Sequence, residues 1–202
     1  MAVMVIGVGV WFALVRMRPL SAKEVAEIVA KCLENGDGAC VYRYAYEREK
    51  ELNKLTPARA QWLLDQFYVP GFAGYKPVDR PVITSSSASG YYSISQAMKD
   101  GQGRLAYRDV DVVETDDGPR VLVVGNLVLG GFAAMYGDTA TDKPMNVRKN
   151  LAWLRGLELD GPRLEAAGFS GFVWRDPSRL TTWKEFAQRT RAVLASLENS
   201  NP

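Results

Sequence analysis

The hydrophobic pattern of this chain changes its period near residue 80, and this change limits the folds that the chain can adopt. Before it, apolar residues recur every three or four positions, as they do on one face of a helix. After it, short segments alternate apolar and polar residues, which is the period of a strand. Helices followed by neighbouring antiparallel strands predict an α+β protein, in which N-terminal helices pack on an antiparallel sheet.

Two helices are predicted before the change of period. Ser21 and Glu24 have the spacing of a capping box and mark the start of the first. Thr56 and Pro57 mark the start of the second, because threonine is a good N-cap and proline is tolerated in the first turn. The segment 39–55 between them fits a helix or a strand, since its tyrosines alternate, but its charge-rich second half favours a helix.

Strands are predicted from residue 81 onward. They are expected in the segments PVITSS, YYSISQAM, RLAYRDVDVVE and RVLVVGNLVLGGFAAMY. Asp117-Gly118 is typical of a hairpin turn, and Gly130-Gly131 indicates a bulge or bend in a long last strand. A short helix, a possible strand in FSGFVWR and a final helix from Thr182 follow this strand.

Residues 21–137 resemble the front end of an NTF2-like domain, the cone-shaped, cystatin-like α+β fold. The carriers are the Gly36-Asp37 turn, the helix start at Leu55-Thr56-Pro57 and the strands from Pro81 to Tyr136. The resemblance implies a sheet curved around helices. Residues 138–198 lie outside it and are expected to form a C-terminal extension packed on the same domain. The family includes isomerases and dehydratases as well as non-catalytic modules, so the resemblance does not specify a function.

The first fifteen residues form an apolar run that ends at Arg16 and Arg18. A dinucleotide-binding turn is disfavoured, because Phe12 stands where a third glycine belongs. A signal peptide is disfavoured, because no charged region precedes the run and no good cleavage site follows it. A helix of this length spans about 22 Å of a hydrocarbon core of about 30 Å. Snorkelling arginines, or a start upstream of Met1, would make up the difference.

We therefore expect residues 1–18 to be a single-pass membrane anchor, with membrane lipid as its partner. The side of the membrane that holds the remaining domain stays open. Burial of the run as an element of the folded domain is the other alternative, although the run lacks a polar face.

The chain contains no histidine, and this excludes several kinds of active site. Ser-His and Cys-His nucleophile pairs and HExxH zinc sites are ruled out. Cys32 and Cys40 are too few for a four-thiolate zinc site. They either close a short disulfide loop or remain two buried thiols. We expect no metal and no cofactor, and with a net charge of +2 we expect no nucleic-acid partner.

Asp109 and Asp111 are the best candidate for a catalytic pair. They alternate with valines in a predicted strand, so both carboxylates lie on one face. Two neighbouring carboxylates in a cavity can divide acid and base roles, with Tyr107 as a hydrogen-bond donor. The same pattern also fits a solvent-exposed strand face opposite a buried row of valines.

Aromatic residues supply a candidate ligand pocket. Trp62, Tyr91 and Tyr107 could line one, although core packing uses the same residue types. The leading functional hypothesis is a non-catalytic, membrane-tethered binding or assembly module for a small ligand or another envelope protein. The alternative is a small-molecule isomerase or hydrolase that uses Asp109 and Asp111 in a cone-shaped pocket.

Overall fold

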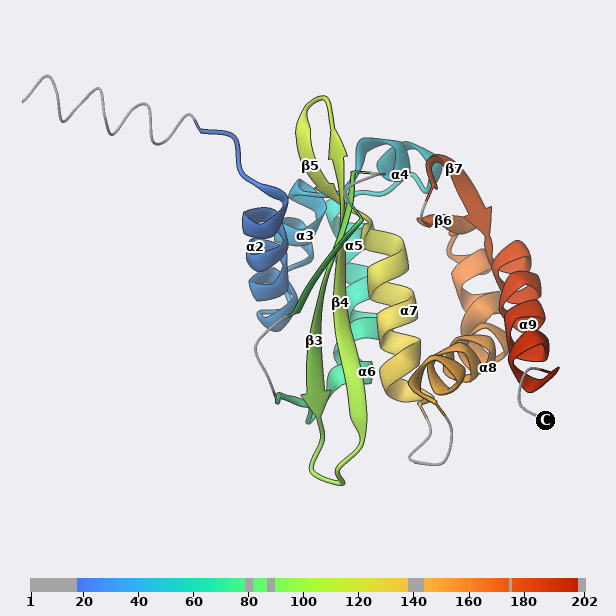
Figure 1. Cartoon of the computed structure of the whole chain (residues 1–202). Helices are drawn as coiled ribbons and strands as arrows, with labels where there is room; N and C mark the ends of the chain where they lie inside the picture. Colours follow the sequence, from blue (N-terminus) through green and yellow to red (C-terminus); the bar gives the residue numbers. More distant parts are fainter. Residues whose placement is uncertain (1–17, 79–81, 87–89, 138–143, 175, 200–202) are drawn as a thin grey trace, which may run out of the picture.

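The computed structural model describes residues 18–78, 82–86, 90–137, 144–174 and 176–199, and it has an α+β fold (Figure 1). The helical elements are α2 (Ala22–Glu34), α3 (Gly38–Arg43), α4 (Glu47–Leu52), α5 (Pro57–Leu63), the π-helical segment η1 (Leu64–Tyr68), α6 (Val69–Phe72), α7 (Val123–Met135), α8 (Met145–Ala166) and α9 (Trp183–Asn199). The strands are β1 (Lys76–Pro77), β2 (Val82–Ser86), β3 (Tyr91–Lys99), β4 (Leu105–Thr115), β5 (Gly118–Val121), β6 (Gly171–Trp174) and β7 (Asp176–Thr182).

The main sheet is antiparallel and strongly curled. Its strand order is β1-β3-β4-β5, and β2 also pairs with β3. The long β3-β4 hairpin forms its centre, with Tyr91 opposite Val113 and Lys99 opposite Leu105. The predicted turn joins β4 to β5, where Thr115 lies opposite Gly118. The predictions of an α+β fold and of the strands β2, β3 and β4 are confirmed.

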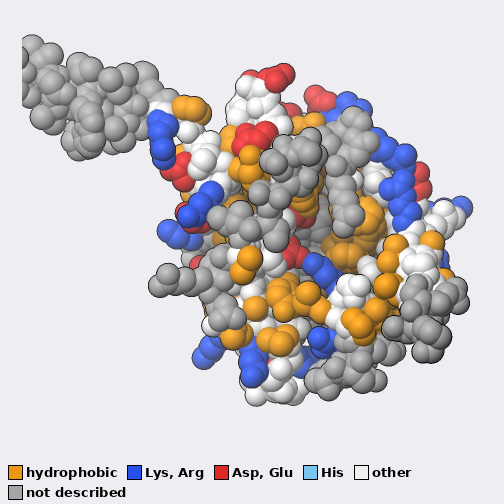
Figure 2. Space-filling model, viewed as in Figure 1, with side chains coloured by type: hydrophobic (Ala, Val, Ile, Leu, Met, Phe, Trp, Pro, Cys, Tyr) orange, Lys and Arg blue, Asp and Glu red, His pale blue; other side chains and the backbone are white. Residues whose placement is uncertain are grey.

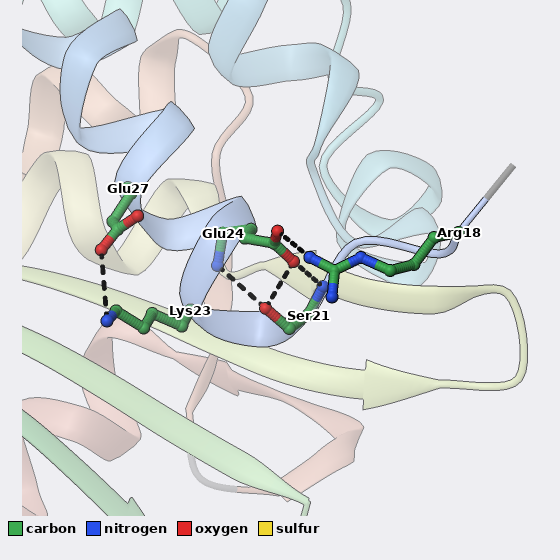
Figure 3. Close-up of polar contacts among 5 residues, drawn as sticks. All are labelled: Arg18, Ser21, Lys23, Glu24 and Glu27. Atoms are coloured by element: carbon green, nitrogen blue, oxygen red, sulfur yellow. Dashed lines mark hydrogen bonds and ion pairs between the residues drawn. The ribbon is translucent and has the colours of Figure 1, made fainter. Parts of the chain in front are cut away.

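The N-terminal helices begin where the sequence predicts. The backbone nitrogen of Glu24 donates to Ser21 Oγ at 3.3 Å, and that of Ser21 donates to Glu24 Oε2 at 2.8 Å (Figure 3). Arg18 also pairs with the Glu24 carboxylate. Thr56 Oγ1 caps α5 by accepting from the backbone nitrogen of Arg59 at 3.2 Å. Segment 39–55 contains most of α3 and all of α4, so it is mainly helical, as expected.

The segment from Val123 to Met135 is a helix, so the prediction of a long last strand there is wrong. Helix α7 packs against β4, η1, α6, α8 and β6, and most of its residues are buried. A segment that is apolar on every side carries no period that distinguishes a buried strand from a buried helix. Here the helix runs beside β4 and packs against it (Figure 1).

Gly130 and Gly131 lie within α7 rather than at a strand bulge, and Gly131 serves helix packing. A Cβ atom on Gly131 would lie 2.3 Å from the carbonyl oxygen of Phe67 in η1. A Cβ on Gly71 in α6 would lie 2.7 Å from the Gly131 carbonyl oxygen. The absence of side chains at both positions lets α7 approach the η1-α6 segment at backbone distance.

The prediction of a single-pass membrane protein is corrected. In the part of the chain that the structure describes, no helix combines the length and apolar character that a membrane crossing requires. Helix α7 is apolar but has 13 residues, about 20 Å of helix, and the 22-residue α8 carries many charges. The apolar run that motivated the anchor lies in residues 1–17, outside the described residues. Arg18, which was expected to snorkel toward lipid, instead pairs with Glu24.

The C-terminal part continues the same core. Helix α8 extends to Ala166, further than the short helix expected, and β6 pairs with β7 as a small antiparallel sheet. Helix α9 starts with the predicted capping box, in which the backbone nitrogen of Thr182 donates to Glu185 Oε2 at 3.0 Å. Phe172 of β6 and Phe186 of α9 are fully buried in the main cluster.

Cys32 of α2 and Cys40 of α3 form a disulfide in the structure, with their Cα atoms 5.8 Å apart. This is one of the two arrangements that the sequence leaves open. The bond ties the end of α2 to α3 across the turn at Gly36, where φ is +66°. This left-handed conformation suits glycine.

Candidate functional site

A cavity of about 550 Å³ lies between the main sheet and the C-terminal elements. One wall comes from β3 and β4, and the others come from α7, α8, β6 and α9. On the face shown in Figure 2, acidic and basic side chains lie next to each other near the centre, among hydrophobic side chains. The volume of the cavity is in the range of small-molecule sites.

The polar wall follows from the register of the β3-β4 hairpin. Ser95 lies opposite Asp109 and Ser93 lies opposite Asp111. Because side chains alternate along a strand, these residues share one face, while Val110 and Val112 are buried in the core. Both aspartates line the cavity. Of the two arrangements that the sequence leaves open, the structure thus has the carboxylates at a cavity.

The two carboxylates have different surroundings. Asp109 accepts a hydrogen bond from Ser95 Oγ at 2.6 Å and forms an ion pair with Lys149 of α8. Asp111 accepts side-chain hydrogen bonds from Tyr91 and Ser93. Burial raises the pKa of Asp111 and the Asp109 carboxylate acts in the same direction, although the two hydrogen bonds and the Lys149 ammonium group oppose them.

Helix α8 supplies the opposite wall through residues three or four positions apart. Asn146, Lys149, Asn150 and Trp153 all line the cavity, and their spacing places them on one helix face. Lys149 Nζ lies 5.3 Å from the centre of the Trp153 ring. The Trp153 indole nitrogen donates to the Leu129 carbonyl oxygen of α7 at 3.0 Å, which fixes the ring.

Aromatic side chains of β6 complete the site. Phe172 and Trp174 line the cavity, with ring centres 6.4 Å apart. Trp174 also contacts Phe186 of α9 edge to face, at 4.9 Å. Phe172 is fully buried, whereas Trp174 keeps part of its surface exposed. The site therefore has a polar wall of carboxylates and an aromatic wall beside it.

A buried glutamate holds two of the cavity walls together. Glu49 of α4 is fully buried and its carboxylate accepts from the backbone nitrogens of Val124 at 3.1 Å and Val173 at 3.5 Å. Val123 and Gly125, also in the first turn of α7, contribute further backbone hydrogen bonds. Burial raises the pKa of Glu49 to about 7, although these hydrogen bonds oppose the shift.

Three aromatic residues were predicted to line a pocket, and the structure brings only Tyr91 to this cavity. Trp62 packs inside the helical core, stacked on Phe169 with ring centres 5.7 Å apart. Tyr107 is on the same strand as the aspartates but lines a much smaller cavity near the end of α7, beside Arg148. Neither Trp62 nor Tyr107 is therefore placed to contact a ligand bound between Asp111 and Trp153.

A second cavity, of about 500 Å³, lies between α2, α6 and the β3-β4 hairpin. Tyr68, Phe72 and Tyr75 line it, together with the buried Arg108. Arg108 donates to Glu34 Oε1 at 2.6 Å and also pairs with Gln96. Its charge is therefore already compensated inside the protein.

Among the described residues, no group of three or more histidine, cysteine, aspartate or glutamate side chains could hold a metal ion.

No protein-family model, curated protein or solved structure matches the chain. The functional argument therefore rests on the geometry of the site.

Sequence reasoning missed Glu49, Lys149 and Trp153. Glu49 lies in a charge-rich segment that reads as a solvated helix, and only the tertiary fold buries it. A signal was present for the other two, because the segment NVRKNLAW places amide, lysine and tryptophan side chains on one helix face. What this face meets depends on the packing of α8 against α7.

Proposed function

We propose that this protein is a non-catalytic binding module whose small ligand occupies the cavity between β4 and α8. The observation that carries the proposal is the combination of Asp109, Asp111 and Lys149 with Trp153 and an aromatic wall in one cavity. Pockets with a largely apolar lining and a few convergent polar groups are typical of small-molecule sites. The polar groups would orient the ligand, and the aromatic groups would bury its apolar part.

The surroundings of the cavity support a preformed site. Lys149 and Asp109 restrain each other across the cavity, and Trp153 is fixed by its hydrogen bond to Leu129. The side chains of Asp109 and Lys149 are 22% and 28% exposed, so a ligand could reach them. Groups that are ordered before binding lose less entropy when the ligand arrives.

We also propose that the domain is NTF2-like. A curled antiparallel sheet that encloses a cavity together with helices supports this assignment. The stretch from Val123 to Met135 departs from the pattern expected for the resemblance, because it is helical. An experimental structure that superposes on a known member of the family across the main sheet would support the proposal, and a different strand connectivity would refute it.

The binding proposal is tested by narrowing the cavity. Val193 of α9 lines it and is 47% exposed, so Val193→Phe should obstruct the opening without disturbing the core. Leu159→Phe is a matched control, because Leu159 is exposed on α8 and is not among the cavity residues. A small-molecule library is screened by thermal shift and isothermal titration calorimetry. Compounds that bind wild type and the control, but not Val193→Phe, are expected; binding unaffected by Val193→Phe would refute the proposal.

The unequal surroundings of the two aspartates favour a second candidate, a small-molecule isomerase or hydrolase. Asp109, paired with Lys149, would act as the base, and Asp111, whose pKa burial raises, would supply a proton. Asp109→Asn and Asp111→Asn would each abolish turnover if this candidate is correct. Unchanged turnover in both variants would exclude it.

A further inference from the structure

We infer that the ligand of this cavity carries an alkylammonium group, which binds between Asp111 and the aromatic side chains of α8 and β6. The inference rests on the proposed binding function and specifies the chemical class of the ligand. It follows from the charge balance of the cavity, from the aromatic wall and from the way in which the protein binds its own lysine there.

The side chains that line the cavity include more carboxylates than ammonium groups. Asp109, Asp111 and Lys149 are the charged side chains among the described residues that line it. Lys149 is paired with Asp109. Lys149 also acts electrostatically on Asp111, but no lysine or arginine of the described chain forms a direct ion pair with it. With both aspartates ionised, two negative charges face one positive charge. The cavity therefore favours a cationic ligand over an anionic one, because charges interact strongly at low dielectric.

Lys149 shows how the cavity accommodates an ammonium group. Its Nζ atom contacts the Asp109 carboxylate on one side and lies 5.3 Å from the Trp153 ring centre on the other. Carboxylates and aromatic faces both stabilise an alkylammonium in proteins. Asp111, Trp153 and Trp174 line the same cavity, so a carboxylate and aromatic side chains also surround a ligand bound there.

Asp111 retains the capacity to accept hydrogen bonds from a ligand. Its carboxylate accepts from the Tyr91 and Ser93 side chains, whereas an ionised carboxylate offers about four acceptor positions. Burial disfavours its ionised form, and a neighbouring ammonium would offset this cost. The apolar residues Leu122 and Leu129 line the same cavity and would contact the rest of the ligand.

The inference is tested with three probes of similar shape and different charge. These are 2-phenylethylammonium, 2-phenylethanol and phenylacetate, titrated at pH 7 and low ionic strength by calorimetry. We expect the ammonium probe to bind about tenfold or more tightly than the alcohol, because a hydrogen bond to a charged group exceeds a neutral one by this factor. Phenylacetate should bind most weakly.

Two variants test whether the preference for the ammonium probe comes from Asp111. Asp111→Asn should abolish the tenfold preference for the ammonium probe and leave the affinity for the alcohol within about threefold. Glu114→Gln is the matched control, because it removes an exposed carboxylate from the same strand outside the cavity, and it should keep the full preference. The probe series on the wild-type protein gives a result even if Asp111→Asn does not fold.

Each outcome distinguishes the two proposals. Equal or tighter binding of the alcohol or of phenylacetate would overturn the ammonium inference and leave the binding function intact. A preference for the ammonium probe that persists in Asp111→Asn would also overturn it. Binding of none of the probes, together with no cavity-dependent binder in the library screen, would overturn the proposed function and the inference with it.

Discussion

Replacing Glu49 by glutamine is expected to destabilise the fold, by an amount that depends on pH. The carboxylate accepts backbone N–H groups from the first turn of α7 and from Val173 of β6, and it is fully buried. Glutamine has the same shape, but its NH₂ group donates and cannot accept. One or two N–H groups would then face another donor without a partner.

The magnitude follows from the number of N–H groups left unsatisfied. A buried polar group without a partner costs about 1–3 kcal/mol. Relative to the protonated Glu49, whose hydroxyl oxygen can still accept, we expect Glu49→Gln to lose about 1–3 kcal/mol of unfolding free energy. This is a substantial part of the roughly 5–15 kcal/mol that stabilises a typical domain.

The pH dependence has a definite sign. Burial raises the pKa of Glu49 from 4.5 to about 7 in the folded state, so the folded protein binds this proton more tightly than the unfolded chain does. The resulting stability is fully present below pH 4.5 and is lost as pH rises through 7. A shift of this size corresponds to about 3 kcal/mol, so the wild type should lose its advantage over the variant above pH 7.

The assay is urea unfolding of both proteins, followed by circular dichroism, at pH 5 and at pH 8.5. Other titrating groups cancel in the difference between wild type and variant. Glu51→Gln is the control, because Glu51 is exposed on the same helix, and it should change stability by less than about 0.5 kcal/mol. A Glu49→Gln effect that is larger at pH 8.5 than at pH 5 would refute the reasoning.

Three further predictions concern the fold. Gly131→Ala should lower the unfolding free energy by at least about 2 kcal/mol, because the new Cβ would lie 2.3 Å from the Phe67 carbonyl oxygen; an unchanged melting temperature would contradict the close packing. Replacing Cys32 and Cys40 by serine should lower the unfolding free energy by about 2–3 kcal/mol. Mass spectrometry should find the unreduced wild type lighter than the reduced wild type by the mass of two hydrogens; free thiols would contradict the disulfide. Thr182→Ala should cost about 1 kcal/mol in thermal unfolding through the lost α9 cap, and no change would exclude that role.

Local features of the chain were predictable because short-range physics determines them. The capping boxes at Ser21 and Thr182 and the turn before Gly118 depend on neighbouring residues, and all three occur in the structure. The α+β class followed from the change of hydrophobic period. The face shared by Asp109 and Asp111 followed from strand alternation alone, and both residues line the cavity.

Features that depend on long-range packing could not be read from the sequence. The stretch Val123–Met135 is apolar throughout, so nothing within it distinguishes a strand from a helix. Its helical state becomes clear only from the contacts of Gly131 with η1. The burial of Glu49 depends on the start of α7 and on β6, which are 75 and 124 residues away along the chain.

The most direct test of the account is an ¹H–¹⁵N NMR titration of the full chain with 2-phenylethylammonium. The account predicts shifts of the indole N–H signals of Trp153 and Trp174 and of the backbone amides of Ser93 and Asp111, all of which belong to residues that line the cavity. The Trp62 indole, in the helical core, should not move. Shifts centred on the second cavity at Tyr68 and Tyr75, or the absence of saturable shifts, would contradict the account.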